Sequence, residues 1–128
     1  MNIIDDVKTF IESKVDLYTS LSIDYFQGKD EEIIIRHNPT TLSEITYLDG
    51  SRNGNFKFSI LTKSLNGSTA VAQLNTLIQE LYLIAGIDIN PLLWVKIEPI
   101  TGIIPISKTE TRQYIYSASF KLEYNRRK

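Results

Sequence analysis

Two segments of the chain repeat apolar residues at the three- and four-residue spacing of an amphipathic helix. The first repeat consists of Ile4, Val7, Ile11 and Val15, and the second of Val71, Leu74, Ile78 and Leu81. Ser68 precedes the second repeat as an N-cap, and Gly86 follows it as a stop signal. The pattern therefore predicts a helix near the start of the chain and a second helix that ends at about Gly86.

The remaining apolar segments have the period of two, or the β-branched composition, that is typical of strands. The predicted strands are residues 21–25, 31–36, 44–48, 56–60, 92–97 and 114–124. The last is the most regular, because Tyr114, Tyr116, Phe120 and Tyr124 share one face with other apolar residues. Together these elements predict an α+β fold: an antiparallel or mixed sheet of about five to six strands, with two main helices packed on one face.

A polar hairpin tip is predicted at Asp49–Gly54, which contains the turn dipeptides Asp-Gly and Asn-Gly. Six polar residues offer no apolar anchor, so we expect this tip to project from the sheet. Asp49 and Arg52 are then interface candidates, with Arg52 facing a neighbouring molecule.

An apolar loop is predicted between the last two strands, where Pro99, Gly102 and Pro105 interrupt any regular element. It contains the isoleucines Ile100, Ile103, Ile104 and Ile106. Exposed apolar side chains in such a cluster are unfavourable, so the loop should pack on its own domain or on a partner. Ile103 and Ile104 are the interface candidates here.

The polar face of the second predicted helix is weakly charged. Between Gln73 and Glu80 it carries only Glu80 as a charge. Such a face suits contact with another subunit, but it also suits plain exposure to water, and the sequence leaves both interpretations open. Gln73 and Gln79 are the interface candidates on this face.

Length and composition indicate one ordinary globular domain, residues 1–128, with a net charge of −1. Residues 1–64 have a charge balance of −3 and residues 65–128 one of +2, which would suit head-to-tail packing of copies. Cys is absent, which excludes disulfides and thiolate metal sites. No apolar stretch is long enough to span a bilayer and the first residues do not resemble a signal peptide, so we expect a protein kept in the cytoplasm.

Catalytic chemistry has little support in the sequence. The single histidine, His37, cannot form a metal cluster, and phosphate-binding loops and nucleophile elbows are missing. The acidic run Asp30–Glu32 is explained by turn chemistry, and the basic tail Arg126–Lys128 by solvation of a chain end. We therefore predict no catalytic, cofactor-binding or metal-binding residue, and no enzyme.

The segment from Tyr47 to Ser64, followed by a helix over Ala70–Leu83, resembles the centre of the small minor capsid proteins of tailed bacteriophages of Gram-positive hosts. Those proteins are similar to the tail-terminator proteins of long-tailed phages. The shared pattern is a hairpin tip with Gly and Arg, an alternating aromatic strand and a helix. An opening helix, a Pro-containing loop between strands and a long closing strand agree with it.

This resemblance implies a structural virion protein that forms a homo-oligomeric ring, usually hexameric, to terminate the tail tube and join tail to head. The implied partners are further copies of the chain, the tail-tube protein and head–tail connector proteins, with a passing contact with DNA. No membrane and no cofactor are implied, and the location is the neck of the virion, or the host cytoplasm during virus assembly. The alternatives are a neck or head-closure component and, in a different class, a small-ligand-binding or enzymatic α+β domain, which would need a concave pocket.

Overall fold

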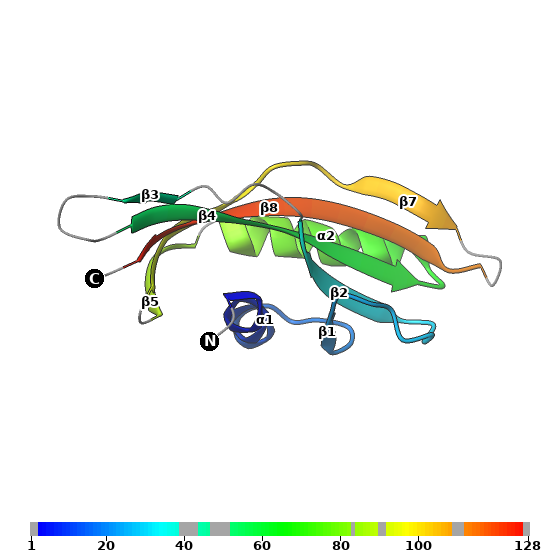
Figure 1. Ribbon diagram of the computed structural model, residues 1–128. Helices are drawn as coiled ribbons and strands as arrows, with labels where there is room; N and C mark the ends of the chain where they lie inside the picture. Colours follow the sequence, from blue (N-terminus) through cyan, green and yellow to red (C-terminus); the bar gives the residue numbers. More distant parts are fainter. Residues whose placement is uncertain are drawn as a thin grey trace.

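The computed structural model describes residues 3–38, 44–46, 52–82, 84–89, 92–108 and 112–126. In these residues the chain forms an eight-stranded sheet and two helices (Figure 1). The elements in chain order are α1 (Ile3–Lys14), β1 (Leu21–Ile23), β2 (Glu32–His37), β3 (Glu44–Thr46), β4 (Arg52–Ser64), α2 (Gly67–Tyr82), β5 (Ala85–Ile89), β6 (Leu92–Pro99), β7 (Ile104–Lys108) and β8 (Tyr114–Arg126). The α+β class with a mixed sheet is confirmed.

The sheet is organised around β4 and β8, which pair antiparallel from Arg52–Arg126 to Ser64–Tyr114. The free edge of each long strand pairs with two shorter strands, one after the other along its length. These are β2 and β3 on β4, and β7 and β6 on β8. β1 is parallel to β2, and β5 is antiparallel to β6. One half of the sheet therefore has the order β1-β2-β4-β8-β7, and the other half has the order β3-β4-β8-β6-β5.

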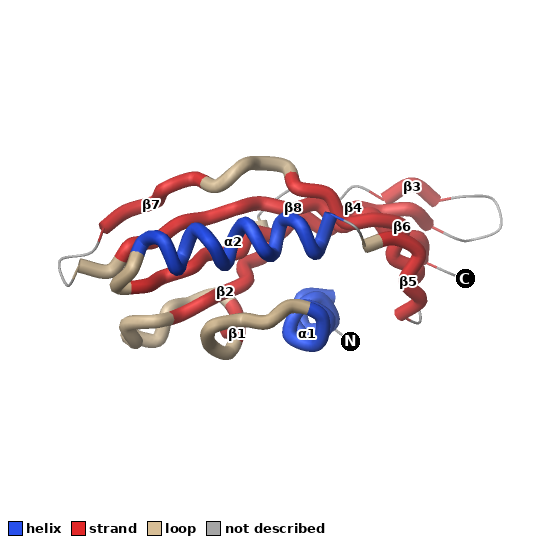
Figure 2. The backbone as a smooth tube through the Cα atoms, turned by 180° about the vertical axis from the view of Figure 1, so that it is seen from behind, coloured by secondary structure: helices blue, strands red, loops and turns tan. Residues whose placement is uncertain are grey.

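Both helices lie on the same face of the sheet, as the sequence predicts (Figure 2). The alternation along β4 and β8 turns Phe56, Phe58 and Phe120 toward them, and the rings of Phe58 and Phe120 stack 5.4 Å apart. The predicted stripe of α1 is buried in the same core: Ile4, Val7, Ile11 and Val15. Phe10 of α1 meets Trp94 of β6 edge-on at 5.3 Å, which joins α1 to the far half of the sheet.

Helix α2 differs from the expectation at both ends. It begins at Gly67, and the capping side chain is that of Asn66, whose Oδ1 accepts a hydrogen bond from the Ser68 N–H at 3.0 Å. It ends at Tyr82, because Ala85–Ile89 pairs with β6 as strand β5. Gly86 has a φ of +66°, so it does adopt the left-handed conformation, but inside β5 and not as the helix stop.

The predicted hairpin is confirmed in part. β3 and β4 pair antiparallel, but Asn53 and Gly54 lie within β4 and pair with both β3 and β8, so this Asn-Gly dipeptide is not a turn. Asp49, with the rest of residues 47–51, falls outside the described residues. Among the helices that are described, none is long and apolar enough to span a membrane.

Candidate functional site: the isoleucine edge and the Tyr25 loop

Three isoleucines are exposed together at one edge of the sheet. Ile100 is 48% exposed, Ile104 45% and Ile106 52%, and we call these three residues the isoleucine edge. Every residue of β7 is exposed to solvent. Ile103 differs from the other three, because it is partly buried and packs against the core. The segment predicted as an apolar loop thus contains a strand, and most of its isoleucines do not pack on their own domain.

The isoleucine edge begins where the chain leaves β6 and enters β7. Both strands pair with the same edge of β8, one after the other, and a short irregular break separates them. At the break, the carbonyl oxygen of Ser119 accepts hydrogen bonds from the N–H groups of Ile100 at 2.8 Å and Thr101 at 3.4 Å. The Ser119 N–H in turn donates to Thr101 Oγ1 at 3.0 Å. β7 then pairs with β8 on one side, and no described strand pairs with its other side. It is therefore an open edge, which offers backbone groups as well as isoleucines to a partner.

Positive charge lies at the end of this edge. Lys108 is the last residue of β7, and its Nζ lies 5.1 Å from the ring centre of Tyr114. Arg112 follows and is also exposed. An exposed apolar strand that ends in a cation, with a second cation just before β8, suits a partner with an apolar group and negative charge.

A second feature lies at the opposite edge of the same half of the sheet, in the connection between β1 and β2. We call residues 24–31 the Tyr25 loop, after its exposed aromatic residue. Tyr25 is 76% exposed. Arg36 fixes the start of the loop, since its Nε and Nη2 donate to the carbonyl oxygen of Asp24 at 3.3 and 3.0 Å. Asp24 itself has a φ of 72°, a conformation that needs such support.

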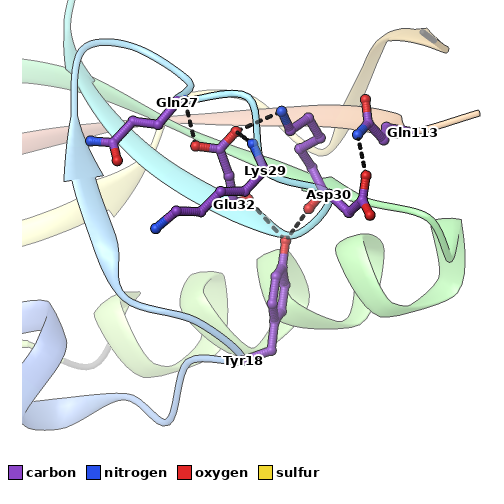
Figure 3. Close-up of polar contacts among 7 residues, drawn as sticks. Tyr18, Gln27, Lys29, Asp30, Glu32 and Gln113 are labelled. Atoms are coloured by element: carbon purple, nitrogen blue, oxygen red, sulfur yellow. Dashed lines mark hydrogen bonds and ion pairs between the residues drawn. The ribbon is translucent and has the colours of Figure 1, made fainter. Parts of the chain in front are cut away.

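The rest of the loop is held by the carboxylate of Glu32, which is almost fully buried (Figure 3). It accepts hydrogen bonds from the N–H groups of Gln27 at 2.5 Å and Lys29 at 3.1 Å. It also pairs with Nζ of Lys63 at 2.6 Å, where both side chains are about 5% exposed. The Lys63 ammonium lies 4.7 Å from the ring centre of Phe26, so the loop covers the ion pair that fastens it.

The balance of forces at Glu32 keeps it ionised. Burial alone would raise its pKa, but the hydrogen bond from Lys63, those from the N–H groups of Gln27 and Lys29, and the positive charge of Lys63 outweigh burial. The net result is a pKa below the ordinary value for a glutamate. The Tyr25 loop is therefore held by a charged and fully partnered carboxylate at neutral pH.

Tyr18 supports the same place from the helix side of the sheet (Figure 3). Its hydroxyl lies 3.1 Å from the carbonyl oxygen of Glu32 and 2.9 Å from that of Lys63. Burial, and next the negative charge of Glu31, raise the pKa of Tyr18, so the hydroxyl stays protonated and able to donate. Its role is to fix the ends of β2 and β4, not to exchange a proton.

Gln73 does not belong to an exposed interface, contrary to the sequence-based expectation. It is only 7% exposed. Its Oε1 accepts a hydrogen bond from the Tyr18 N–H at 2.9 Å, and its Nε2 donates to the carbonyl oxygen of Asp16 at 3.2 Å. Because both ends of the amide are used within the chain, Gln73 fastens the segment between α1 and β1. Gln79, by contrast, is exposed on α2.

A shallow hollow of about 840 Å³ lies between the start of α2 and β8. Its lining includes Asn66, Ser68, Asn75, Tyr114 and Tyr116. Tyr114 and Tyr116 share the predicted apolar face of β8 with Tyr124, but they are only partly buried, whereas Tyr124 is buried. The hollow is wide open to solvent, and no group of three metal-ligating side chains occurs in the described part of the chain.

The other predicted residues lie apart from these features. Arg52 has its backbone in β4, and its side chain is not among those described. His37 is exposed and stacks on Phe56, with ring centres 4.9 Å apart. Sequence reasoning missed Tyr25 and the Glu32–Lys63 pair. The available signal was the acidic run immediately before a β-branched strand, which we had assigned to turn chemistry.

Neither models of known protein families nor curated proteins match this chain. The features on which a functional argument can be based are therefore geometric. They are an exposed apolar edge with positive charge, and a rigidly held loop with an exposed aromatic residue on the opposite edge of the sheet.

Proposed function

We propose that the chain is a structural virion protein that forms a ring, terminates the phage tail tube and joins tail to head. The observation that carries this proposal is the isoleucine edge, because a domain with a well-packed core here leaves three isoleucines exposed, two of them on an open strand. Contact with another protein would remove this apolar surface from water and pair the free backbone groups. The expectation from the resemblance is a partner that is a further copy, in a ring of usually six.

The mechanism would be one of assembly. A copy whose contact surfaces differ on its two sides binds the next copy head to tail, and such a heterologous contact closes into a ring when the rotation between copies allows it. A ring seated on the growing tube blocks the addition of further tube subunits and presents its other side to the connector proteins of the head. A neck or head-closure component would use the same kind of ring at a neighbouring level.

The test combines mass and tube length. Mass is measured by light scattering for the protein alone and then with tail tubes of the same phage, and tube lengths are measured by electron microscopy. We expect binding at tube ends and a limit on tube length. A protein that stays monomeric, does not bind tubes and leaves their length unchanged contradicts the proposal.

The hollow beside α2 favours a second candidate, a small-ligand-binding domain. Tyr114 and Tyr116 offer aromatic rings there, and Asn66, Ser68 and Asn75 offer polar groups. Ligand pockets usually enclose most of their ligand, and this hollow is too open for that. A screen of nucleotides and sugars by thermal shift distinguishes the candidates. A ligand that raises the unfolding temperature of the free protein, but not that of Tyr116→Ala, would favour the small-ligand-binding domain.

A further inference from the structure

We propose that the partner of the isoleucine edge is the Tyr25 loop of a second copy of this chain. The inference rests on the proposed function, because it names the surfaces through which a ring would close. It adds a specific contact: Tyr25 of one copy packs against Ile100, Ile104 and Ile106 of the next.

The positions of the two surfaces permit this contact only between copies. Ile104 and Ile106 lie on β7, Ile100 lies just before it, and Tyr25 follows β1, so the strand order β1-β2-β4-β8-β7 separates them (Figure 1). The far end of the Tyr25 loop does reach the residue before β8, where Asp30 Oδ1 accepts a hydrogen bond from Gln113 Nε2 at 2.8 Å. Tyr25 itself and the isoleucines lie at opposite edges of the sheet, so they do not meet within a chain. A copy that offers one surface at each edge can bind a neighbour on both sides in the same way, which is a heterologous contact.

The chemistry of the two surfaces is complementary. Tyr25 is a large, exposed aromatic residue, and aromatic anchors of this kind contribute much of the binding energy at interfaces. Its loop is already ordered by Glu32 and Arg36, so little conformational entropy is lost on binding. The three isoleucines provide an apolar surface for the ring, while the tyrosine hydroxyl can remain at the rim.

Charge favours the same pairing. The Tyr25 loop contains three acidic residues, Asp24, Asp30 and Glu31, and one basic residue, Lys29, a net charge of −2. Lys108 and Arg112 are exposed near the end of the isoleucine edge. The acidic loop of one copy thus suits the basic end of the next, whereas two isoleucine edges in contact would bring like charges together.

The experiment uses the absence of native cysteine. One variant carries Gln27→Cys in the Tyr25 loop and another carries Ser107→Cys in β7, so that Tyr25 and the isoleucines stay in place. Each is treated with a short bis-maleimide alone and in an equal mixture, with and without tail tubes. Both positions are exposed, so neither substitution should disturb the core. We expect a covalent dimer in the mixture and none from either variant alone.

Two matched controls test whether the reaction is specific. Tyr82 at the end of α2 is an aromatic residue 64% exposed, and Val95 of β6 is an apolar residue 44% exposed. Tyr82→Cys mixed with Ser107→Cys, and Val95→Cys mixed with Gln27→Cys, should both fail to cross-link. Thermal unfolding of each variant shows whether it is folded.

The outcomes separate this inference from the proposed function. A dimer from Ser107→Cys alone, or no dimer in the mixture even on tubes, overturns the Tyr25 contact. If the wild-type protein nevertheless binds tube ends and limits tube length, the proposed function stands and another surface covers the isoleucine edge. If the mixture cross-links but tubes are neither bound nor limited, the contact between copies is real and the tail function is wrong.

Discussion

Substituting Glu32 by Gln should destabilise the folded chain far more than its small change in shape suggests. The carboxylate accepts hydrogen bonds from the backbone N–H groups of Gln27 and Lys29, and it pairs with Lys63 at 2.6 Å in a nearly fully buried position. In Glu32→Gln one acceptor oxygen becomes an amide donor, and the Lys63 ammonium stays buried without a counter-charge. Removing one partner of a buried ion pair costs about 3–5 kcal/mol, and we expect about 3 kcal/mol here because Phe26, which covers the pair, is only partly buried.

The assay is urea unfolding followed by fluorescence of the single tryptophan, Trp94. A loss of about 3 kcal/mol with a slope of about 1.5 kcal/mol per molar urea moves the midpoint down by about 2 M. The matched control is Glu12→Gln, which breaks the Lys8–Glu12 pair one helical turn apart at 2.7 Å on the exposed face of α1. That variant should lose less than about 0.5 kcal/mol.

The pH dependence provides an independent check. The pKa of Glu32 is lower in the folded chain than its ordinary value of 4.5, so the folded state favours the carboxylate. This contribution to stability is complete above the unfolded pKa and is lost as pH falls through the folded pKa. The difference between wild type and Glu32→Gln should therefore shrink as pH decreases below about 4.5. A loss under about 1 kcal/mol at pH 7, or a pH-independent difference, would refute the assigned role of the ion pair.

Four further outcomes are expected. Gln73→Leu should lower the free energy of unfolding by about 2 kcal/mol in urea titration, because the Tyr18 N–H and the Asp16 carbonyl lose their partner. Gly86→Ala should cost about 1 kcal/mol in the same assay, because alanine is strained at a φ of +66°. Ile104→Asp should change stability by less than about 0.5 kcal/mol yet abolish self-association in light scattering. Raising the salt concentration from 0.1 to about 0.5 M should weaken that association, because exposed charges are then screened more strongly.

The sequence predicts the fold well where one pattern dominates a segment. The stripe of α1, and the alternation of β8 from Ala118 to Tyr124, are each buried on a single face, so local periodicity and the final packing agree there. The prediction fails where tertiary pairing overrides local preference. Asn53 and Gly54 form a turn dipeptide, but the long pairing with β8 extends through them and keeps them in a strand.

The candidate surfaces are harder to predict because they depend on contacts between distant residues. An exposed polar face and a buried amide look alike along a helix, so only the proximity of Asp16 and Tyr18 distinguishes Gln73 from Gln79. The isoleucine segment was identified as an interface candidate, but its division into partly buried Ile103 and exposed Ile104 depends on the break opposite Ser119. The acidic run Asp30–Glu32 is the available signal near Tyr25, but local sequence does not show that Glu32 is the member that is buried and orders the loop.

The central pairing of β4 with β8 also determines how the chain must fold. Its paired residues are 50 to 74 positions apart in sequence, from Ser64–Tyr114 to Arg52–Arg126. The segment between them, including α2 and the β5–β6 hairpin, must be brought into a closed loop before the first of these pairs is stable. Folding should therefore be slow, on a scale of milliseconds to seconds, and until β8 docks β4 has an unpaired edge that can bind a second unfinished chain. Newly made copies are then most at risk of aggregation before the last strand is complete.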